Sequence, residues 1–302
     1  MKKPNLAKII CGFLALPLLA AWLTSCSGGD SATVADGARQ GEHPFTSYRP
    51  PDSLEKHTIQ FRGRLADSDT DEFPYYADIE ISWGWELFGG SAAEYSNDLA
   101  IAGLALSSAA ENTEAKTEEM LSILGFDGEK TQSYDYYTSF FEMQKVAHTF
   151  AYQNVRLDQK QYNVFAIVNR GTHDASDYMT DGLAVFGAFE IAAMNTLSDF
   201  AKFMSASTGK SLAELQDEEN IFFITGHSLG GAVGNVIARQ LFKFASSEKI
   251  FAYTYASPRP ALVFGTNAEN IFNIINLEDL VPNLPPFFPG RAGVHIFFSR
   301  KD

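Results

Sequence analysis

The stretch "NIFFITGHSLGGAVGNVIARQL", residues 220–241, joins a strand-like run to a helix-like run through a glycine-rich turn. Its first part, "NIFFIT", is a short continuous apolar run of the kind that forms a buried strand. Its second part carries apolar residues on one face at helical spacing. Ser228 lies between the two, at the centre of a G-x-S-x-G pattern. The stretch therefore predicts a strand over 220–225, a tight turn at Ser228 and a helix over 229–244.

A serine in such a turn adopts a strained backbone conformation, and side chains two positions before and after it would collide. Gly226 and Gly230 occupy these two positions. The turn is expected to lift the Ser228 hydroxyl above the sheet edge and to aim the Leu229 N–H toward the place where an oxyanion forms. This setting is typical of a nucleophile, and an ordinary glycine-rich turn is the alternative. His227 is expected to be a packed structural histidine, because neighbours in such a turn point in different directions.

The rest of the chain predicts alternating strands and helices. Strands are expected at 57–65, 75–83, 146–154, 163–169, 250–256, 271–276 and 293–299. Further helices are expected at 95–111, 113–126 and 183–204, the first of them capped by Ser96 or Asn97. From residue 163 onward strands and helices alternate, which predicts an α/β fold: a mainly parallel sheet covered by helices on both faces.

The N-terminus is predicted to lie outside the folded domain. Residues 1–25 carry three lysines and then a run of apolar residues, which is a secretory signal pattern. An uncleaved membrane helix is the alternative, but the apolar run is short for a span. The segment ends in "LTSC", which resembles the lipobox of bacterial lipoprotein precursors and implies cleavage before Cys26 and lipidation of its sulfur. We therefore expect a signal peptide at 1–25, a flexible tether at 26–45 and one domain at 46–302.

These features predict an exported protein that is anchored by lipid to a bacterial membrane. Ser27 after Cys26 resembles the sorting pattern of outer-membrane lipoproteins, so the outer membrane or the cell surface is expected. The acyl chains would supply membrane attachment. The formal net charge of −14 argues against a nucleic-acid partner. A monomer is expected. No disulfide is expected within the mature chain, because Cys11 leaves with the signal peptide and Cys26 carries lipid.

Four segments occur in the order and approximate spacing of one known family. They are "YNVFAIVNRGTHDASDYMTD" (162–181), "TGHSLGGA" (225–232), "YTYASPRP" (253–260) and "NIINLEDLVPNLPP" (273–286). Together they resemble the class 3, fungal-type triacylglycerol lipases, over about residues 145–300. The resemblance implies an α/β-hydrolase fold.

The resemblance also implies roles for particular residues. Ser228 would be the nucleophile, and Thr172 and the Leu229 N–H would be the two oxyanion donors. Asp279 would be the triad acid; it also follows a predicted buried strand, at the edge where open α/β sheets place their sites. The alternatives are a capping or salt-bridged role for Asp279, a turn role for Thr172, and Glu278 as the acid.

The segment that follows the oxyanion position matches the place of the family's lid. Residues 173–190 overlap the apolar run "GLAVFGAFEIAAM" (182–194), which predicts either a buried core helix or part of a mobile cover. Tyr178 stands where the family usually has tryptophan, so the behaviour of a lid does not carry over with the fold.

The base that would activate Ser228 is the open question. A serine hydroxyl needs a base, and α/β-hydrolases place it in the chain order serine, acid, histidine. Only His295 follows Asp279, whereas in the family the catalytic histidine comes later, beyond another strand. Either His295 is a strand residue and the chain is cut short, or the last strand turns to bring His295 to Ser228, or the fold serves binding. His173 adjoins the oxyanion position but stands in the wrong chain order.

We therefore predict a serine hydrolase that cleaves carboxylic esters of lipids through an acyl-enzyme, with no cofactor and no metal. The chain has no HExxH motif, no cysteine pair for zinc and no phosphate-binding glycine loop. The acidic run "DSDTDE" at 67–72 lacks the glycine and the distant glutamate of a calcium loop. The alternatives are a catalytically weak lipoprotein that binds at the surface, and a phospholipase or general carboxylesterase.

Overall fold

A computed structural model of the chain describes residues 54–63, 75–136, 145–171, 187–215, 219–260, 268–284 and 290–298. The predicted signal peptide, the tether with Cys26, and Thr172 lie outside these ranges. The predicted lid lies outside them as well, apart from residues 187–190.

The described strands form one large sheet and one hairpin. The large sheet has seven strands in the order β3-β4-β5-β6-β7-β8-β9. The pairs β3–β4 and β4–β5 are antiparallel, and every later pair is parallel. The bounds are β3 Thr131–Tyr134, β4 His148–Leu157, β5 Lys160–Asn169, β6 Asn220–His227, β7 Ile250–Tyr255, β8 Ile271–Asn276 and β9 Val294–Phe298. The strands β1 Glu55–Gly63 and β2 Tyr75–Trp83 form the antiparallel hairpin.

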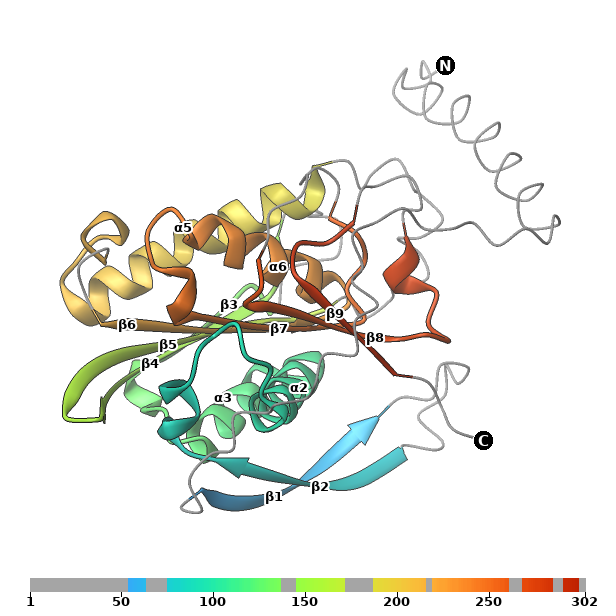
Figure 1. Cartoon of the computed structure of the whole chain (residues 1–302), viewed down its shortest axis with the longest axis horizontal. Helices are drawn as coiled ribbons and strands as arrows, with labels where there is room; N and C mark the ends of the chain where they lie inside the picture. The colour runs from blue at the N-terminus through green and yellow to red at the C-terminus, as the bar shows by residue number, and fades with distance from the viewer. Residues whose placement is uncertain are drawn as a thin grey trace, which may run out of the picture.

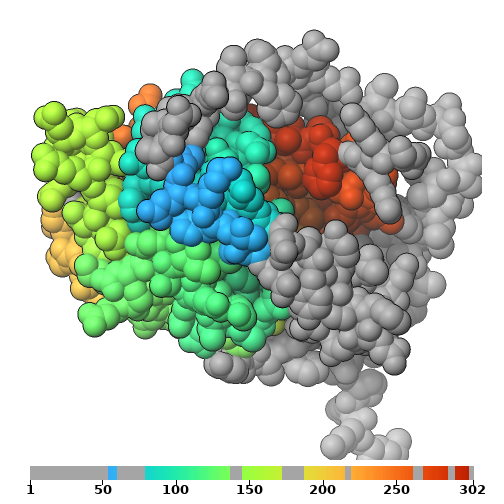
Figure 2. All heavy atoms as spheres, turned by 90° about the horizontal axis from the view of Figure 1, so that it is seen from below, coloured from blue at the N-terminus to red at the C-terminus, as the bar shows by residue number. Residues whose placement is uncertain are grey.

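Helices cover both faces of the large sheet. Figure 1 shows α5 (Ala188–Thr208) and α6 (Leu229–Leu241) on one face, and α2 (Asn97–Asn112) and α3 (Glu114–Ile123) on the other. The β1–β2 hairpin lies outside α2, and Figure 2 shows it on the surface beside the green helices. Short 3-10 helices are η1 Trp85–Gly89, η2 Gly128–Lys130, η3 Leu212–Leu215, η4 Ser247–Lys249 and η5 Val281–Asn283. The predicted fold class, a mainly parallel sheet between two helical layers, is confirmed.

Most predicted elements are present, with shifted ends. The expected helix at 95–111 is α2, and Ser96 caps it by accepting a hydrogen bond from the Leu99 N–H at 3.3 Å. The short polar strand β3 was not predicted, because "TQSY" has no apolar pattern and pairs only at the end of the sheet. Within the described ranges, every helix is too short or too polar to cross a membrane.

Burial on both faces of the central strand β6 explains the continuous apolar residues in its sequence. Phe223 packs with α2 and α3, while Phe222 and Ile224 pack with α5 and α6. Residues 220–226 are all buried, because helices cover both faces of this strand. Nearly all the apolar surface of the strand is therefore removed from water, which stabilises the sheet at the point where the turn of Ser228 begins.

A row of residues in register, all but one of them polar, crosses the sheet from β4 to β9. The pairing registers align His148, Asn169, Gly226, Thr254, Asn273 and His295, one from each strand from β4 to β9. We call this set the cross-strand row. The side-chain amide of Asn235 in α6 donates to Asn273 Oδ1 at 3.0 Å and to the Ala292 backbone carbonyl at 2.8 Å. The amide of Asn235 thereby joins α6 to the segment that leads into β9.

Candidate active site

Ser228 occupies the sharp turn between β6 and α6. Its φ of 51° and ψ of −124° lie in a region that residues with a side chain rarely adopt. The Ser228 N–H donates to the Tyr255 carbonyl at 2.9 Å, which fixes the turn against the end of β7. The side chain is 8% exposed, and it caps no N–H of the helix. The predicted strand–turn–helix setting is confirmed, and it leaves the hydroxyl free of a structural partner within the helix.

Two glycines make this turn possible for steric reasons. A Cβ on Gly226 would come closer than 3.0 Å to the Gly230 carbonyl, and one on Gly230 would come equally close to the Asn169 carbonyl. The start of α6 therefore packs directly against the backbones of β5 and β6. The predicted collision at these two positions is confirmed.

The Leu229 N–H lies at the first position of α6. Donors in the first turn of a helix have no acceptor within the helix, and the helix dipole favours negative charge there. This N–H is therefore available to an oxyanion next to Ser228. The other expected donor, Thr172, lies outside the described residues, but its neighbour Gly171 is described.

Gly171 and the turn of Ser228 are held by one carboxylate that sequence reasoning missed. The Gly171 N–H donates to Glu111 Oε1 at 3.0 Å, and His227 Nδ1 lies 3.1 Å from the same oxygen. His227 is thus engaged with α2, but its side chain is 44% exposed, so it is not the packed histidine that the sequence predicted. An acidic residue in the last turn of a helix was the available signal, because helix dipoles disfavour it there.

Asp279 lies three residues past the end of β8, at the same edge of the sheet as Ser228. Its Oδ1 accepts a hydrogen bond from the Val281 N–H at 2.9 Å, so part of the carboxylate is engaged at the start of the short helix η5. Arg291 packs nearby and donates to the carbonyls of Ser257 and Pro282. Glu278 is exposed on the loop beside Asp279.

His295 is the second residue of β9, and the structure does not bring it to Ser228. The cross-strand row puts His295 three strands away from Gly226, a lateral distance of about 14 Å at the usual strand spacing. Its Nε2 is buried without a hydrogen-bond partner. Burial, with Arg291 and Arg259 nearby, lowers the pKa of His295 to about 4, which suits a general base poorly. The expectation that a turn of the last strand brings His295 to Ser228 is therefore corrected: His295 is a strand residue.

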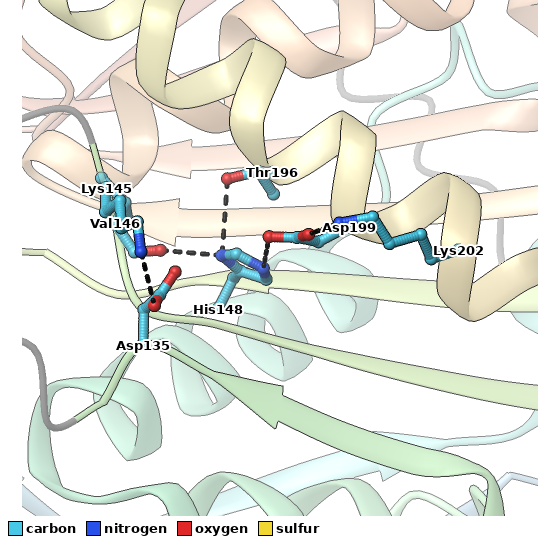
Figure 3. A network of polar contacts seen from close by, with 7 residues as sticks. All are labelled: Asp135, Lys145, Val146, His148, Thr196, Asp199 and Lys202. Atoms are coloured by element: carbon cyan, nitrogen blue, oxygen red, sulfur yellow. Dashed lines mark hydrogen bonds and ion pairs between the residues drawn. The ribbon is translucent and has the colours of Figure 1, made fainter.

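His148 stands at the other end of the cross-strand row and serves structure. Figure 3 shows its imidazole between the Val146 carbonyl, Thr196 and Asp199. Its Nδ1 lies 2.7 Å from the Val146 oxygen, and its Nε2 faces Asp199 on α5 at 3.8 Å. The side chain is 1% exposed, and burial lowers its pKa. In the described part of the chain, no hydrogen bond joins a histidine to the Ser228 hydroxyl.

The described part of the site contains groups that acyl transfer uses. A strained, unpartnered serine adjoins a free helix N–H, and a carboxylate lies at the same sheet edge, as nucleophilic catalysis requires. Within the described ranges, no cluster of histidine, cysteine, aspartate and glutamate is placed to hold a metal ion.

Comparisons with known proteins give one family match and one structural likeness. Residues 166–288 match the family model described as lipase (class 3). Among solved structures, the chain is similar to one described as the native propeptide complex of the lipase from Rhizomucor miehei. That match has 20% sequence identity, a TM-score of 0.36 and coverage of 67% of each chain. The search of curated proteins finds no match.

Replacing Gly230 by alanine should unfold the turn. The added methyl group would collide with the Asn169 and Arg170 carbonyls, so we expect a loss of about 3 kcal/mol or more in the free energy of unfolding. Urea titration measures it. Gly128→Ala is the control, because nothing lies within 4 Å of its added Cβ. Equal stability of the two variants would contradict the packing described for this turn.

His295 should make the fold sensitive to acid. Its pKa is about 4 in the folded chain and about 6.5 in the unfolded chain, so the unfolded chain binds the proton first as the pH falls. Stability should therefore drop between about pH 6.5 and pH 4. In His295→Leu, the loss between about pH 7.5 and pH 5 should be smaller by about 2 kcal/mol. Urea unfolding at both pH values tests this, and an equal loss in the wild type and His295→Leu would contradict it.

Proposed function

We propose that the chain is a serine hydrolase that cleaves carboxylic esters of lipids, because residues 166–288 match the family model for class 3 lipases. Ser228 attacks the ester carbonyl, and its hydroxyl proton passes to a base. The Leu229 N–H, with Thr172, stabilises the tetrahedral oxyanion, the alcohol leaves, and water hydrolyses the acyl-enzyme. The strained backbone of Ser228 carries the proposal, because it holds the hydroxyl at the start of α6 beside that N–H.

An apolar rim around this edge favours a lipid substrate. In the described part of the chain, the large apolar side chains that are exposed lie in three segments: the start of α5, the loop after β8 and the end of β9. Thr196 lies against His148 of the cross-strand row, so the start of α5 is at the same edge as the other two segments. Exposed apolar patches on soluble proteins mark binding sites for apolar partners. The residues are Ile191, Met194, Leu277, Leu280, Phe297 and Phe298.

The lack of a described histidine at the Ser228 hydroxyl supports a second candidate. No described histidine is hydrogen-bonded to the Ser228 hydroxyl, and an oxyanion hole without a base leaves only about 10³ to 10⁴-fold catalysis over water. The second candidate is therefore a weakly active protein of the same fold that binds lipid at the rim. The first candidate requires a base from outside the described residues.

Ser228→Ala should separate the two candidates. For an enzyme, hydrolysis of short and long p-nitrophenyl esters should fall at least about 1,000-fold, because the nucleophile is lost. A p-nitrophenyl phosphonate should label the wild type at Ser228, as seen by mass spectrometry. Ser205→Ala, at an exposed position on α5, is the matched control and should keep wild-type turnover.

Equal turnover by the wild type and Ser228→Ala would sink the enzyme proposal. Retained binding of both proteins to phosphatidylcholine vesicles would then favour the binding protein. Replacing each histidine by alanine assigns the base. We expect His295→Ala to keep its activity, because that side chain is three strands from the turn.

We also propose that the chain is exported and held at the membrane by lipid on Cys26. The signal pattern and "LTSC" support this proposal. In bacterial cells fed with labelled palmitate, the protein should carry label, and Cys26→Ser should carry none and leave the membrane fraction. The neighbouring variant Ser27→Ala is the control for lipidation. Labelled Cys26→Ser protein would contradict the proposal.

A further inference from the structure

Glu111 joins two segments of the candidate site that are far apart in sequence. It lies in the last turn of α2, and its Oε1 is the acceptor for the Gly171 N–H at 3.0 Å. The same oxygen lies 3.1 Å from His227 Nδ1, so this nitrogen carries the proton. Gly171 ends the described part of the segment after β5, and His227 directly precedes Ser228. One oxygen therefore sets the position of both segments.

The position of this carboxylate is unfavourable unless it has partners. The C-terminal end of a helix carries partial negative charge, and α2 has no basic residue in its last turn. The Gly171 N–H and the His227 imidazole supply the compensating donors. A local feature that is unfavourable by itself and is compensated only by residues of the site is typical of a functional constraint.

The Gly171 Cα has no space for a side chain beside Glu111 and His227. A Cβ on Gly171 would come 2.9 Å from the His227 carbonyl and still closer to Glu111 Oε1. The Gly171 backbone is therefore packed between the carboxylate and the turn of Ser228. Any withdrawal of the carboxylate oxygen removes the acceptor that holds the Gly171 N–H, and it frees the segment that leads to the next residue.

We infer that Glu111 is a positioning residue that fixes the Arg170–Gly171 segment against the turn of Ser228. It does not touch the reacting atoms. It holds the chain immediately before the proposed oxyanion donor in register with the proposed nucleophile, and so it deepens and rests on the function proposed above. Its effect is on the transition state, because small misplacements of stabilising groups slow the chemical step.

Two substitutions separate the reach of the oxygen from its charge. Glu111→Asp keeps the charge but withdraws the oxygen by one bond, so kcat on p-nitrophenyl butyrate should fall about 10-fold to 100-fold with KM unchanged. Glu111→Gln keeps an oxygen at the same reach for both donors, so its kcat should stay within about threefold of the wild type. The full chain in detergent is used throughout. Glu119→Asp and Glu119→Gln, at an exposed site on α3, are the matched controls.

A second measurement does not depend on turnover. Hydrogen exchange followed by mass spectrometry reports the protection of the peptide that ends at Gly171. Exchange there should accelerate in Glu111→Asp and stay near the wild-type rate in Glu111→Gln, because only the first loses the acceptor.

The outcomes for Glu111 and for the proposed function can be told apart. If Ser228-dependent turnover is present, wild-type kcat in Glu111→Asp, or an equal loss in both variants, overturns the positioning role and leaves the function in place. If the wild type shows no Ser228-dependent turnover, the proposed function fails, and hydrogen exchange alone decides. Equal protection at Gly171 in both variants would then overturn the inference.

Discussion

The close approach of α6 to the backbones of β5 and β6 is the constraint on which the rest of the structure depends. Gly226 and Gly230 face each other with no room for a side chain, and the Asn169 carbonyl lies against both. Because the helix starts so near the sheet, the chain turns within a single residue. Ser228 takes that position with a positive φ. The burial of β6 between two helical layers supplies the packing that holds this strained turn in place.

The same approach brings polar groups together where the strands end. Asn273 and Thr254 are completely buried in the cross-strand row, and Asn235 comes to them from α6. Buried amides are costly unless they are hydrogen-bonded, and these are bonded to one another and to Ala292. The network joins the helix of the nucleophile to the loop that leads into β9. Glu111 makes the equivalent connection on the other face, from α2 to Gly171 and His227.

Local patterns in the sequence predicted the turn because its causes are local. The apolar run 220–225, the glycines around Ser228 and the apolar face of the helix are all contained in one stretch, and each acts on its neighbours. The alternation of strands and helices after residue 163 predicted the parallel sheet for the same reason. Strand β3 escaped prediction because only its partner β4 makes "TQSY" a strand.

The parts of the site that depend on contacts between distant residues could not be predicted. Glu111 and Gly171 are 60 positions apart, and no periodic pattern relates them. The place of His295 depends on which strand β9 pairs with and in which register. Neither the neighbouring strand nor the register can be read from the local sequence of β9. Chain order made His295 the candidate base, whereas the order of strands in space separates it from Ser228.

The strain at Ser228 bears on the choice between catalysis and binding. A residue held at φ 51° and ψ −124° costs about 1 to 3 kcal/mol, and glycine would remove most of that cost without loss of packing. A protein that only binds lipid at an apolar rim gains nothing from a strained serine beneath it. An enzyme gains a hydroxyl fixed at the start of a helix, beside a free N–H and held by Glu111 through its neighbour His227. The cost of this turn therefore supports the proposed chemistry at Ser228 over binding alone.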